Sequence, residues 1–220
     1  MTATTDFSAD REAMIETQLR SRGITEPHIL EAFRAVPREE FVSAERRHLA
    51  YGDHPLPIEA GQTISQPYIV ALMIQAAGIA PGDKVLEVGA GSGYAAAIIG
   101  RIASRVIGIE RHPQLVRIAR ERIKQLRYDN VEIVAGDGTR GWPKEAPYDA
   151  ILAAASGSHV PKTLIQQLAP EGVIVMPVGD PRWTQTLVKV RKRTDGTLEQ
   201  SDLGGVRFVP LVGEEGWSDS

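Results

Sequence analysis

Three glycines at alternate positions, Gly89, Gly91 and Gly93, follow an apolar stretch that ends at Val88 and precede Tyr94. Glycine has no Cβ, so it lets a ligand approach the backbone and adopts turn angles that other residues avoid. A strand that runs through such a turn into a helix can hold a nucleotide-like ligand at the helix N-terminus. The alternative is a tight connection that binds nothing. Tyr94 stands where a dinucleotide site has its last glycine, which argues against NAD or FAD.

Two acidic residues follow the glycine run at the ends of later apolar stretches. Glu110 lies about twenty residues on, where an acid can accept hydrogen bonds from both ribose hydroxyls, although a glutamate there can also simply be solvated. Asp137, between Gly136 and Gly138, can reach an adenine amino group, and an ordinary Asp-Gly turn is the alternative. Because the carboxyl ends of parallel strands meet at one edge of a sheet, we expect these side chains to lie close together.

The residues from Gly61 to Pro67 read Gly-Gln-Thr-Ile-Ser-Gln-Pro. Ser65 can serve as the N-cap of a helix that begins near Pro67, because its hydroxyl can accept a hydrogen bond from a free backbone N–H. That interpretation leaves the four residues before Ser65 unexplained. The base and acid of a hydrolase triad are not evident near Ser65, so we do not expect a covalent nucleophile.

The composition limits the kinds of protein to consider. With 220 residues and 42% hydrophobic content, the chain is long enough for one main domain with a good core. A formal net charge of −3 gives no general attraction to nucleic acid. Cysteine is absent, which excludes disulfides and thiolate nucleophiles, and the 5 histidines lack metal-ligand spacing, so we expect no metal site.

The N-terminus lacks the basic and then apolar order of a signal peptide. The longest apolar stretch, residues 69–80, is interrupted by Gln75 and Gly78 and is too short to span a bilayer. These features favour a cytoplasmic protein without membrane contact.

The spacing of apolar residues predicts the elements that position these groups. A helical segment covers residues 9–49, an irregular connection rich in turn formers covers 51–67, and a helix covers 67–77. From residue 84 onward strands and helices alternate. The expected strands are 84–88, 105–109, 131–134, 149–153 and 173–177, and the expected helices are 94–102, 113–126 and 161–168.

The end of the chain has a different pattern. Two longer strands are expected at residues 184–193 and 205–209 with a turn at 194–196, and the acidic end, residues 214–220, is expected to fray. The predicted fold class is α/β, with a doubly wound, mostly parallel, Rossmann-like sheet. A helical N-terminal segment precedes this sheet, and a C-terminal antiparallel hairpin follows it.

The glycine run with the two acids resembles the class I S-adenosylmethionine-dependent methyltransferases, whose loop has the same Gly-x-Gly-x-Gly form. Residues 51–57, 61–67, 85–94 and 208–211, with Arg22-Gly23-Ile24 near the start, resemble the protein-L-isoaspartate O-methyltransferase family. The likeness covers nearly the whole chain, and the Thr-Ile-Ser-Gln-Pro segment is close to diagnostic. Val70 stands where some animal members have histidine, and residues 153–159 are a loose version of the family's loop, so neither receives a role.

The resemblance implies a role for each motif. Ser65 would be the active-site residue and would contact the acceptor together with Val209, Pro210 and Leu211. The methyl donor would contact Thr63, Ile64, Gln66, Gly89, Ala90, Gly91, Ser92, Gly93, Glu110, Asp137 and Gly138. We expect one methyltransferase domain over residues 1–220, made of an N-terminal segment with the acceptor loop (1–80), a donor-binding core (81–180) and a C-terminal hairpin and tail (181–220).

The implied reaction transfers a methyl group from S-adenosylmethionine to the free α-carboxylate of L-isoaspartyl residues, which starts repair through a succinimide. The partners would be damaged proteins and peptides, with no nucleic acid, membrane or metal, and the protein would be a monomer. A methyltransferase of one dedicated peptide or of a small metabolite is an alternative. A nicotinamide oxidoreductase and a non-catalytic sensor of the donor are two others.

Overall fold

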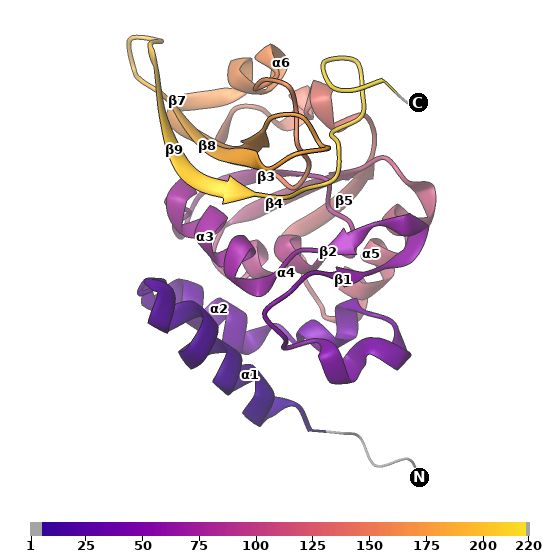
Figure 1. The fold of residues 1–220 in the computed structure, drawn as a ribbon. Helices are drawn as coiled ribbons and strands as arrows, with labels where there is room; N and C mark the ends of the chain where they lie inside the picture. The colour runs from indigo at the N-terminus through magenta and orange to yellow at the C-terminus, as the bar shows by residue number, and fades with distance from the viewer. Residues whose placement is uncertain (1–5, 219–220) are drawn as a thin grey trace.

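The computed structural model describes residues 6–218 and is built around a seven-stranded sheet with the order β5-β4-β3-β6-β7-β8-β9 (Figure 1). Strands β3 to β7 run parallel, whereas β8 and β9 add to β7 in antiparallel pairing. The strands are β3 Lys84–Val88, β4 Arg105–Glu110, β5 Val131–Ala135, β6 Tyr148–Ala153, β7 Leu168–Val178, β8 Gln185–Lys192 and β9 Leu198–Val206. The predicted α/β class with a terminal antiparallel part is therefore confirmed.

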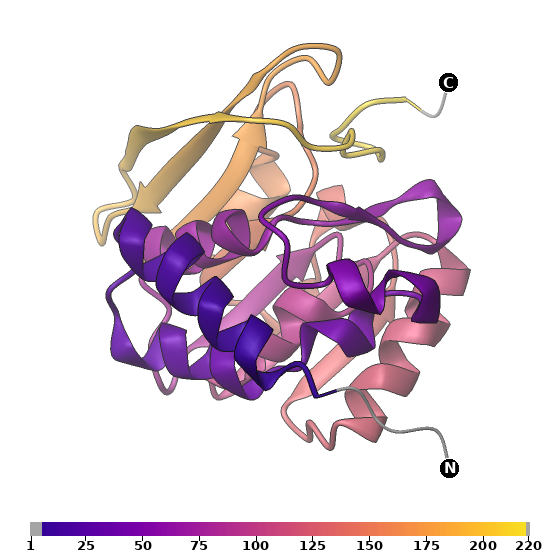
Figure 2. The same ribbon diagram turned by 60° about the horizontal axis from the view of Figure 1, so that its bottom comes forward.

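Helices cover both faces of this sheet (Figure 1). Three of them, α3, α4 and α5, pack on one face, and α6 packs against β7 on the other. The N-terminal helices α1 and α2 lie outside α3 and α4, as a third layer (Figure 2). The helices are α1 Ser8–Met14, α2 Pro27–Ala35, α3 Pro67–Ala77, α4 Tyr94–Gly100, α5 Pro113–Gln125 and α6 Lys162–Gln166.

Local sequence explains why α3 has the bounds that were predicted. Pro67 occupies the first helical turn, where its missing N–H has no partner to lose. Gly78 ends the helix in the left-handed conformation with φ 70°, which glycine adopts without a Cβ clash. Between them α3 is apolar on most sides, because it lies between the sheet and the N-terminal layer.

The strand order reverses between β3 and β6, since β4 and β5 lie on one side of β3 and β6 and β7 on the other. In open α/β sheets ligands bind at this reversal, outside the carboxyl ends of the strands. The glycine run begins directly after β3, so the fold places it at that point.

The predicted strand at residues 205–209 is wrong, because the last strand is β9 Leu198–Val206. This strand forms the sheet edge and is exposed along most of its length, so its residues need no alternation of polar and apolar types. The apolar group after Val206 leaves the sheet instead, and Pro210 forms a parallel bridge with Ser156.

The expected fraying of the acidic end is also wrong for the part that the structure describes. The carboxylate of Glu215 accepts hydrogen bonds from the backbone N–H of Lys162, at 2.8 Å, and from the Thr163 hydroxyl at the start of α6. The Trp217 indole donates to the Ser156 carbonyl at 2.8 Å. The cap that Glu215 forms on α6 and the hydrogen bond of Trp217 therefore hold the tail, while residues 219–220 lie outside the described range.

The stretch predicted as an irregular connection contains a small antiparallel hairpin. Leu56–Pro57 forms β1 and Thr63–Ile64 forms β2, with Leu56 paired to Ile64.

Over residues 6–218, no helix is both long and apolar enough to cross a membrane.

Candidate active site

The glycine run forms a loop whose backbone needs glycine at three positions. Gly89, Gly91 and Gly93 have φ of 85°, 54° and 88°, all in the left-handed region. The N–H groups of Gly89 and Ala90 both donate to the Ile109 carbonyl at 2.9 Å, which ties the loop to the end of β4. Gly89 and Gly91 are half-buried, and the absence of a Cβ at these positions leaves room for close approach of a nucleoside.

Glu110 lies at the end of β4 beside this loop. Its Oε2 accepts the N–H of Gly91 at 2.9 Å, and its Oε1 accepts the N–H of His112 at 2.8 Å. The residue is only 5% exposed, so its carboxylate is fixed in one orientation. Each carboxylate oxygen keeps a further acceptor site, which fits hydrogen bonds from two ribose hydroxyls.

Asp137 follows β5 and is bound more tightly than the sequence suggested. Its Oδ1 accepts the N–H and hydroxyl of Thr139 at 2.9 and 2.7 Å, and its Oδ2 accepts the N–H of Glu214 at 2.8 Å. Asp137 thus forms the Asp-Gly turn that was the alternative, and it also anchors the C-terminal tail. A Cβ on the neighbouring Gly138 would lie 2.5 Å from Cγ1 of Val88, so this position too requires glycine.

A hollow of about 330 Å³ opens beside Asp137 at the carboxyl edge of the sheet. The C-terminal tail supplies one wall, so residues that are far apart in the sequence line the same hollow. The lining residues are Arg111, Gly136, Asp137, Val212, Gly213, Trp217 and Ser218. The position and mixed polarity of this hollow suit the base end of a nucleoside whose ribose is held at Glu110.

The predicted acceptor segment, residues 56–67 with the β1–β2 hairpin, lies against the glycine loop. The Cδ1 atom of Ile58 lies 3.6 Å from where a Cβ on Gly91 would be, and Arg122 of α5 approaches Glu59 at 4.0 Å. Arg122 also donates to the carbonyl of Ser92 at 3.4 Å. The hairpin and the C-terminal tail lie on the same side of the molecule, to the right in Figures 1 and 2. The fold therefore brings the two predicted halves of the site together.

Ser65 follows β2 and is not the N-cap of α3. Gln66 occupies that position, and no side chain caps the helix. The structural alternative for the Ser65 hydroxyl is therefore removed. The Ser65 carbonyl accepts a hydrogen bond from the buried Arg38 at 2.8 Å, which fixes the backbone that carries the hydroxyl.

Gln66 does not point its amide freely toward a ligand. Its Nε2 donates to the Asp53 carboxylate at 2.6 Å and to the Asp53 carbonyl at 3.1 Å. Arg22 pairs with the same carboxylate at 3.1 Å and stacks on Tyr68, with 3.4 Å from its Cζ to the ring centroid. Asp53 thus ties the Arg22-Gly23-Ile24 motif to the acceptor segment.

The predicted acceptor residues after β9 lie beside the loop after β6. The Val209 carbonyl accepts the N–H of Ser156 at 2.8 Å, and the N–H of Leu211 donates to the Ser156 carbonyl at 2.8 Å. The Leu211 side chain is 5% exposed and packs in the core, whereas Pro210 is exposed. Surface contacts of this segment therefore depend on Val209 and Pro210 more than on Leu211.

Sequence reasoning missed Glu87, a fully buried acid in the middle of β3. Desolvation raises the pKa of Glu87 well above its ordinary value, the nearby Glu110 adds to this, and a hydrogen bond from the Ala96 N–H opposes it. One carboxyl oxygen has no hydrogen-bond partner among residues 6–218. The available signal was a lone acid in an apolar strand directly before the glycine loop.

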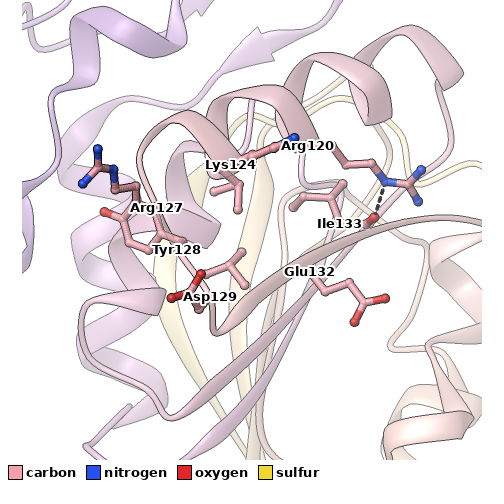
Figure 3. Close-up of a pocket in the computed structure, with 9 residues that line it drawn as sticks. Arg120, Lys124, Arg127, Tyr128, Asp129, Glu132 and Ile133 are labelled. Carbon is pink, nitrogen blue, oxygen red and sulfur yellow. Dashed lines mark hydrogen bonds between the residues drawn. The ribbon is translucent and has the colours of Figure 1, made fainter.

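Another hollow, of about 360 Å³, lies elsewhere (Figure 3). It is lined by the end of α5 and the start of β5, the opposite end of that strand from Asp137. Arg120 there donates to the Ile133 carbonyl at 2.7 Å, which satisfies an acceptor of the sheet edge.

Within the described residues, no group of three or more His, Cys, Asp or Glu side chains is arranged to hold a metal ion.

Comparison with known sequences identifies one enzyme family over nearly the whole chain. The model of the protein-L-isoaspartate(D-aspartate) O-methyltransferase family matches residues 9–216. Protein-L-isoaspartate O-methyltransferase 2 of Pelobacter propionicus is 54% identical over 207 residues, covering 94% of this chain and 92% of that protein. The protein-L-isoaspartate O-methyltransferase of Koribacter versatilis is 51% identical over 214 residues, covering 97% and 96%.

Solved structures agree with this relationship. A protein-L-isoaspartate O-methyltransferase superposes with a TM-score of 0.86 at 31% identity, over 94% of this chain and 67% of the other. A structure from Plasmodium falciparum, described as an enzyme of this type in complex with S-adenosyl-L-homocysteine, gives a TM-score of 0.79 at 27% identity, covering 95% and 99%. From its sequence and its fold alike, this chain belongs to the protein-L-isoaspartate(D-aspartate) O-methyltransferase family.

Proposed function

We propose that this protein transfers a methyl group from S-adenosylmethionine to the free α-carboxylate of L-isoaspartyl residues in damaged proteins and peptides. The observation that carries the proposal is the family match over residues 9–216, which includes the acceptor segment as well as the glycine loop. The closeness of Ile58 to the glycine loop supports it, because methyl transfer requires an acceptor segment that lies next to the donor.

S-adenosylmethionine, when bound, supplies a methyl group on a sulfonium sulfur that is already activated for transfer. Gly89, Ala90, Gly91, Ser92 and Gly93 would form its cradle. Glu110 would bind the ribose hydroxyls, and Asp137 and Gly138 would line the base end together with the tail. Thr63, Ile64 and Gln66 would close the donor pocket from the acceptor side.

Geometry rather than proton transfer would dominate the reaction. A carboxylate with a pKa of about 4 is ionised at neutral pH, so the acceptor needs no general base. The Ser65 hydroxyl would hydrogen-bond the acceptor carboxylate, while Val209, Pro210 and Leu211 would hold the peptide beside it. Alignment of two reactants in a closed site can supply about 7 kcal/mol or more of the barrier reduction.

The product chemistry explains how methylation serves repair. Attack of the neighbouring backbone nitrogen on the new ester expels methanol and closes a succinimide ring. Hydrolysis of that ring returns part of the population to normal aspartate. We propose that residues 1–220 act as one unit for this task, as a cytoplasmic monomer that uses no nucleic acid.

Labelled S-adenosylmethionine and a matched pair of peptides test the proposal. One peptide contains isoaspartate and the other contains aspartate at the same position. We expect label in the isoaspartyl peptide only, and equal labelling of both would contradict the proposal. A methyltransferase of one dedicated peptide would be recognised if a panel of isoaspartyl peptides with different flanking residues gave label in one member alone.

A further inference from the structure

Arg38 is a charged side chain with no exposure to solvent, in the helical turn Arg38–Phe41 of the N-terminal segment. Desolvation lowers the pKa of its guanidinium, and the nearby Tyr94 and Tyr51 oppose that shift. The adjacent Glu39 does not neutralise it, because Glu39 pairs with Arg11 at 3.0 Å. Burial of a cation without a carboxylate partner is unfavourable, so the interactions that it makes instead call for an explanation.

These interactions connect the two halves of the active site. Arg38 Nε donates to the Ala50 carbonyl at 2.7 Å, and Nη2 donates to the Ser65 carbonyl at 2.8 Å. The remaining Nη1 has no hydrogen-bond partner among the described residues. The guanidinium lies over the ring of Tyr94, 4.7 Å from its centroid, and Tyr94 is the first residue of the helix that follows the glycine loop.

We propose that Arg38 is a positioning residue for methyl transfer, which holds the peptide group of Ser65 at a fixed place relative to the glycine loop. A planar fork with two donors can fix two carbonyls at once, which a lysine ammonium does not reproduce. The Ser65 carbonyl belongs to the residue whose hydroxyl would bind the acceptor, so fixing that carbonyl holds in place the Cα from which the hydroxyl projects. This inference rests on the proposed function.

The contacts of Arg38 predict a specific kinetic defect. Displacement of a reacting group by about 1 Å can reduce the rate about 100-fold. Arg38→Met should therefore lower kcat by about 10- to 100-fold with an isoaspartyl peptide. The dissociation constant of S-adenosylhomocysteine should stay near that of the parent protein, because Arg38 contacts the acceptor segment directly at Ser65 and approaches the donor loop only through the side chain of Tyr94.

Arg38→Lys keeps the charge and loses the fork, so it separates positioning from simple charge burial. We expect it to fold and to bind S-adenosylhomocysteine normally, with kcat still reduced. Arg11→Met is the matched control, because Arg11 bonds Tyr51, Glu39 and the Arg34 carbonyl in the same segment and does not contact Ser65. This control should lower the melting temperature and leave kcat unchanged at temperatures well below melting.

A double-mutant cycle decides whether Arg38 acts through Ser65. In the Ser65→Ala background, Arg38→Lys should change kcat by less than about threefold, since coupled residues are not additive. An equal loss in both backgrounds would overturn the proposal. Wild-type kcat in Arg38→Lys would overturn it too, as would failure of this variant to fold or to bind S-adenosylhomocysteine. If the unmodified protein labels no isoaspartyl peptide, the proposed function fails instead, so the two failures are distinguishable.

Discussion

At the scale of single residues, three carboxylates near the glycine loop have different environments. Glu110 is held by two backbone N–H groups, and Asp137 is held by a turn and by the tail. Glu87 is buried in β3 and makes one hydrogen bond to the backbone. Contacts rather than residue type therefore determine which of these acids can accept bonds from a ligand.

Glu110 and Ser65 should affect different steps of the reaction. Glu110→Ala should weaken binding of S-adenosylhomocysteine by about 2 kcal/mol, because it removes charge-assisted hydrogen bonds to the ribose. Ser65→Ala should lower kcat more than donor affinity. Calorimetry and steady-state kinetics measure the two effects. Glu132→Ala is a control, since that acid pairs with Arg105 at the far end of the strands. The opposite pattern would show that the two roles were assigned wrongly.

Glu87 should make the stability of the ligand-free protein depend on pH. Its pKa is raised in the native state, so the native state binds more protons than the unfolded state above pH of about 4.3. The free energy of unfolding should therefore fall as pH rises from that value through the raised native pKa. The amide of Glu87→Gln is neutral at every pH, so this variant should lose the slope. At high pH its free energy of unfolding should exceed that of the parent protein by about 1.4 kcal/mol for each unit of pKa shift. Urea unfolding from pH 5 to 8 tests this, and parallel curves for the two proteins would disprove it.

At the scale of elements, the C-terminal tail is the part that sequence patterns described least well. Its acidic composition suggested fraying, yet Glu215 caps α6 and Trp217 bonds the loop after β6. The β9 edge strand was misplaced for a related reason, because exposed elements lack the apolar pattern that marks buried ones. By contrast, the bounds of α3 and β3 follow directly from proline, glycine and continuous apolar residues.

Two adjacent acids in the tail form a matched pair of substitutions. Glu215→Ala should lower the free energy of unfolding by about 1 kcal/mol through loss of a cap, and it should weaken binding of S-adenosylhomocysteine by loosening a wall of the hollow. Glu214→Ala should have almost no effect, because its side chain only forms an exposed ion pair with Arg140. Thermal unfolding and calorimetry compare the two. Similar effects on both would show that the cap does not hold the tail.

At the scale of the whole molecule, one hydrophobic cluster joins the N-terminal helices to the sheet. It contains Met14 and Phe33 from the outer layer together with Val85 of β3 and Val206 of β9. The phenolic ring of Tyr94 packs against the rings of Phe33 and Phe41. These contacts connect the N-terminal layer to α4, the helix after the glycine loop. Unfolding of the N-terminal layer should therefore be coupled to that of the donor cradle.

Product binding should consequently stabilise the entire protein in one transition. S-adenosylhomocysteine at 100 times its Kd adds about 2.7 kcal/mol, which corresponds to a rise in Tm of about 5 to 10 °C for a chain of this size. Differential scanning calorimetry with and without ligand measures the shift. Two transitions, of which only one moved with ligand, would contradict the coupling.

The sequence was sufficient to predict that the glycine loop follows β3 and that Glu110 and Asp137 lie at strand ends, since glycine spacing and apolar runs are local signals, and their binding of the donor stays a prediction. It could not show that Arg38 binds the Ser65 carbonyl, because that contact joins residues 27 positions apart. Nor could it show that Asp137 binds the backbone of Glu214, 77 positions away. Contacts of this kind depend on how layers pack, which no short motif encodes.

The wall that the tail contributes to the hollow beside Asp137 has a consequence for biosynthesis. Val212, Gly213 and Trp217 lie more than a hundred residues after the glycine loop, so they leave the ribosome later than that loop does. A nascent chain can thus form the cradle long before it can enclose a donor. Under the proposed assignment, methyl transfer begins only after residues 212–217 have been synthesised, and proteolytic removal of those residues would silence an enzyme whose core is still folded.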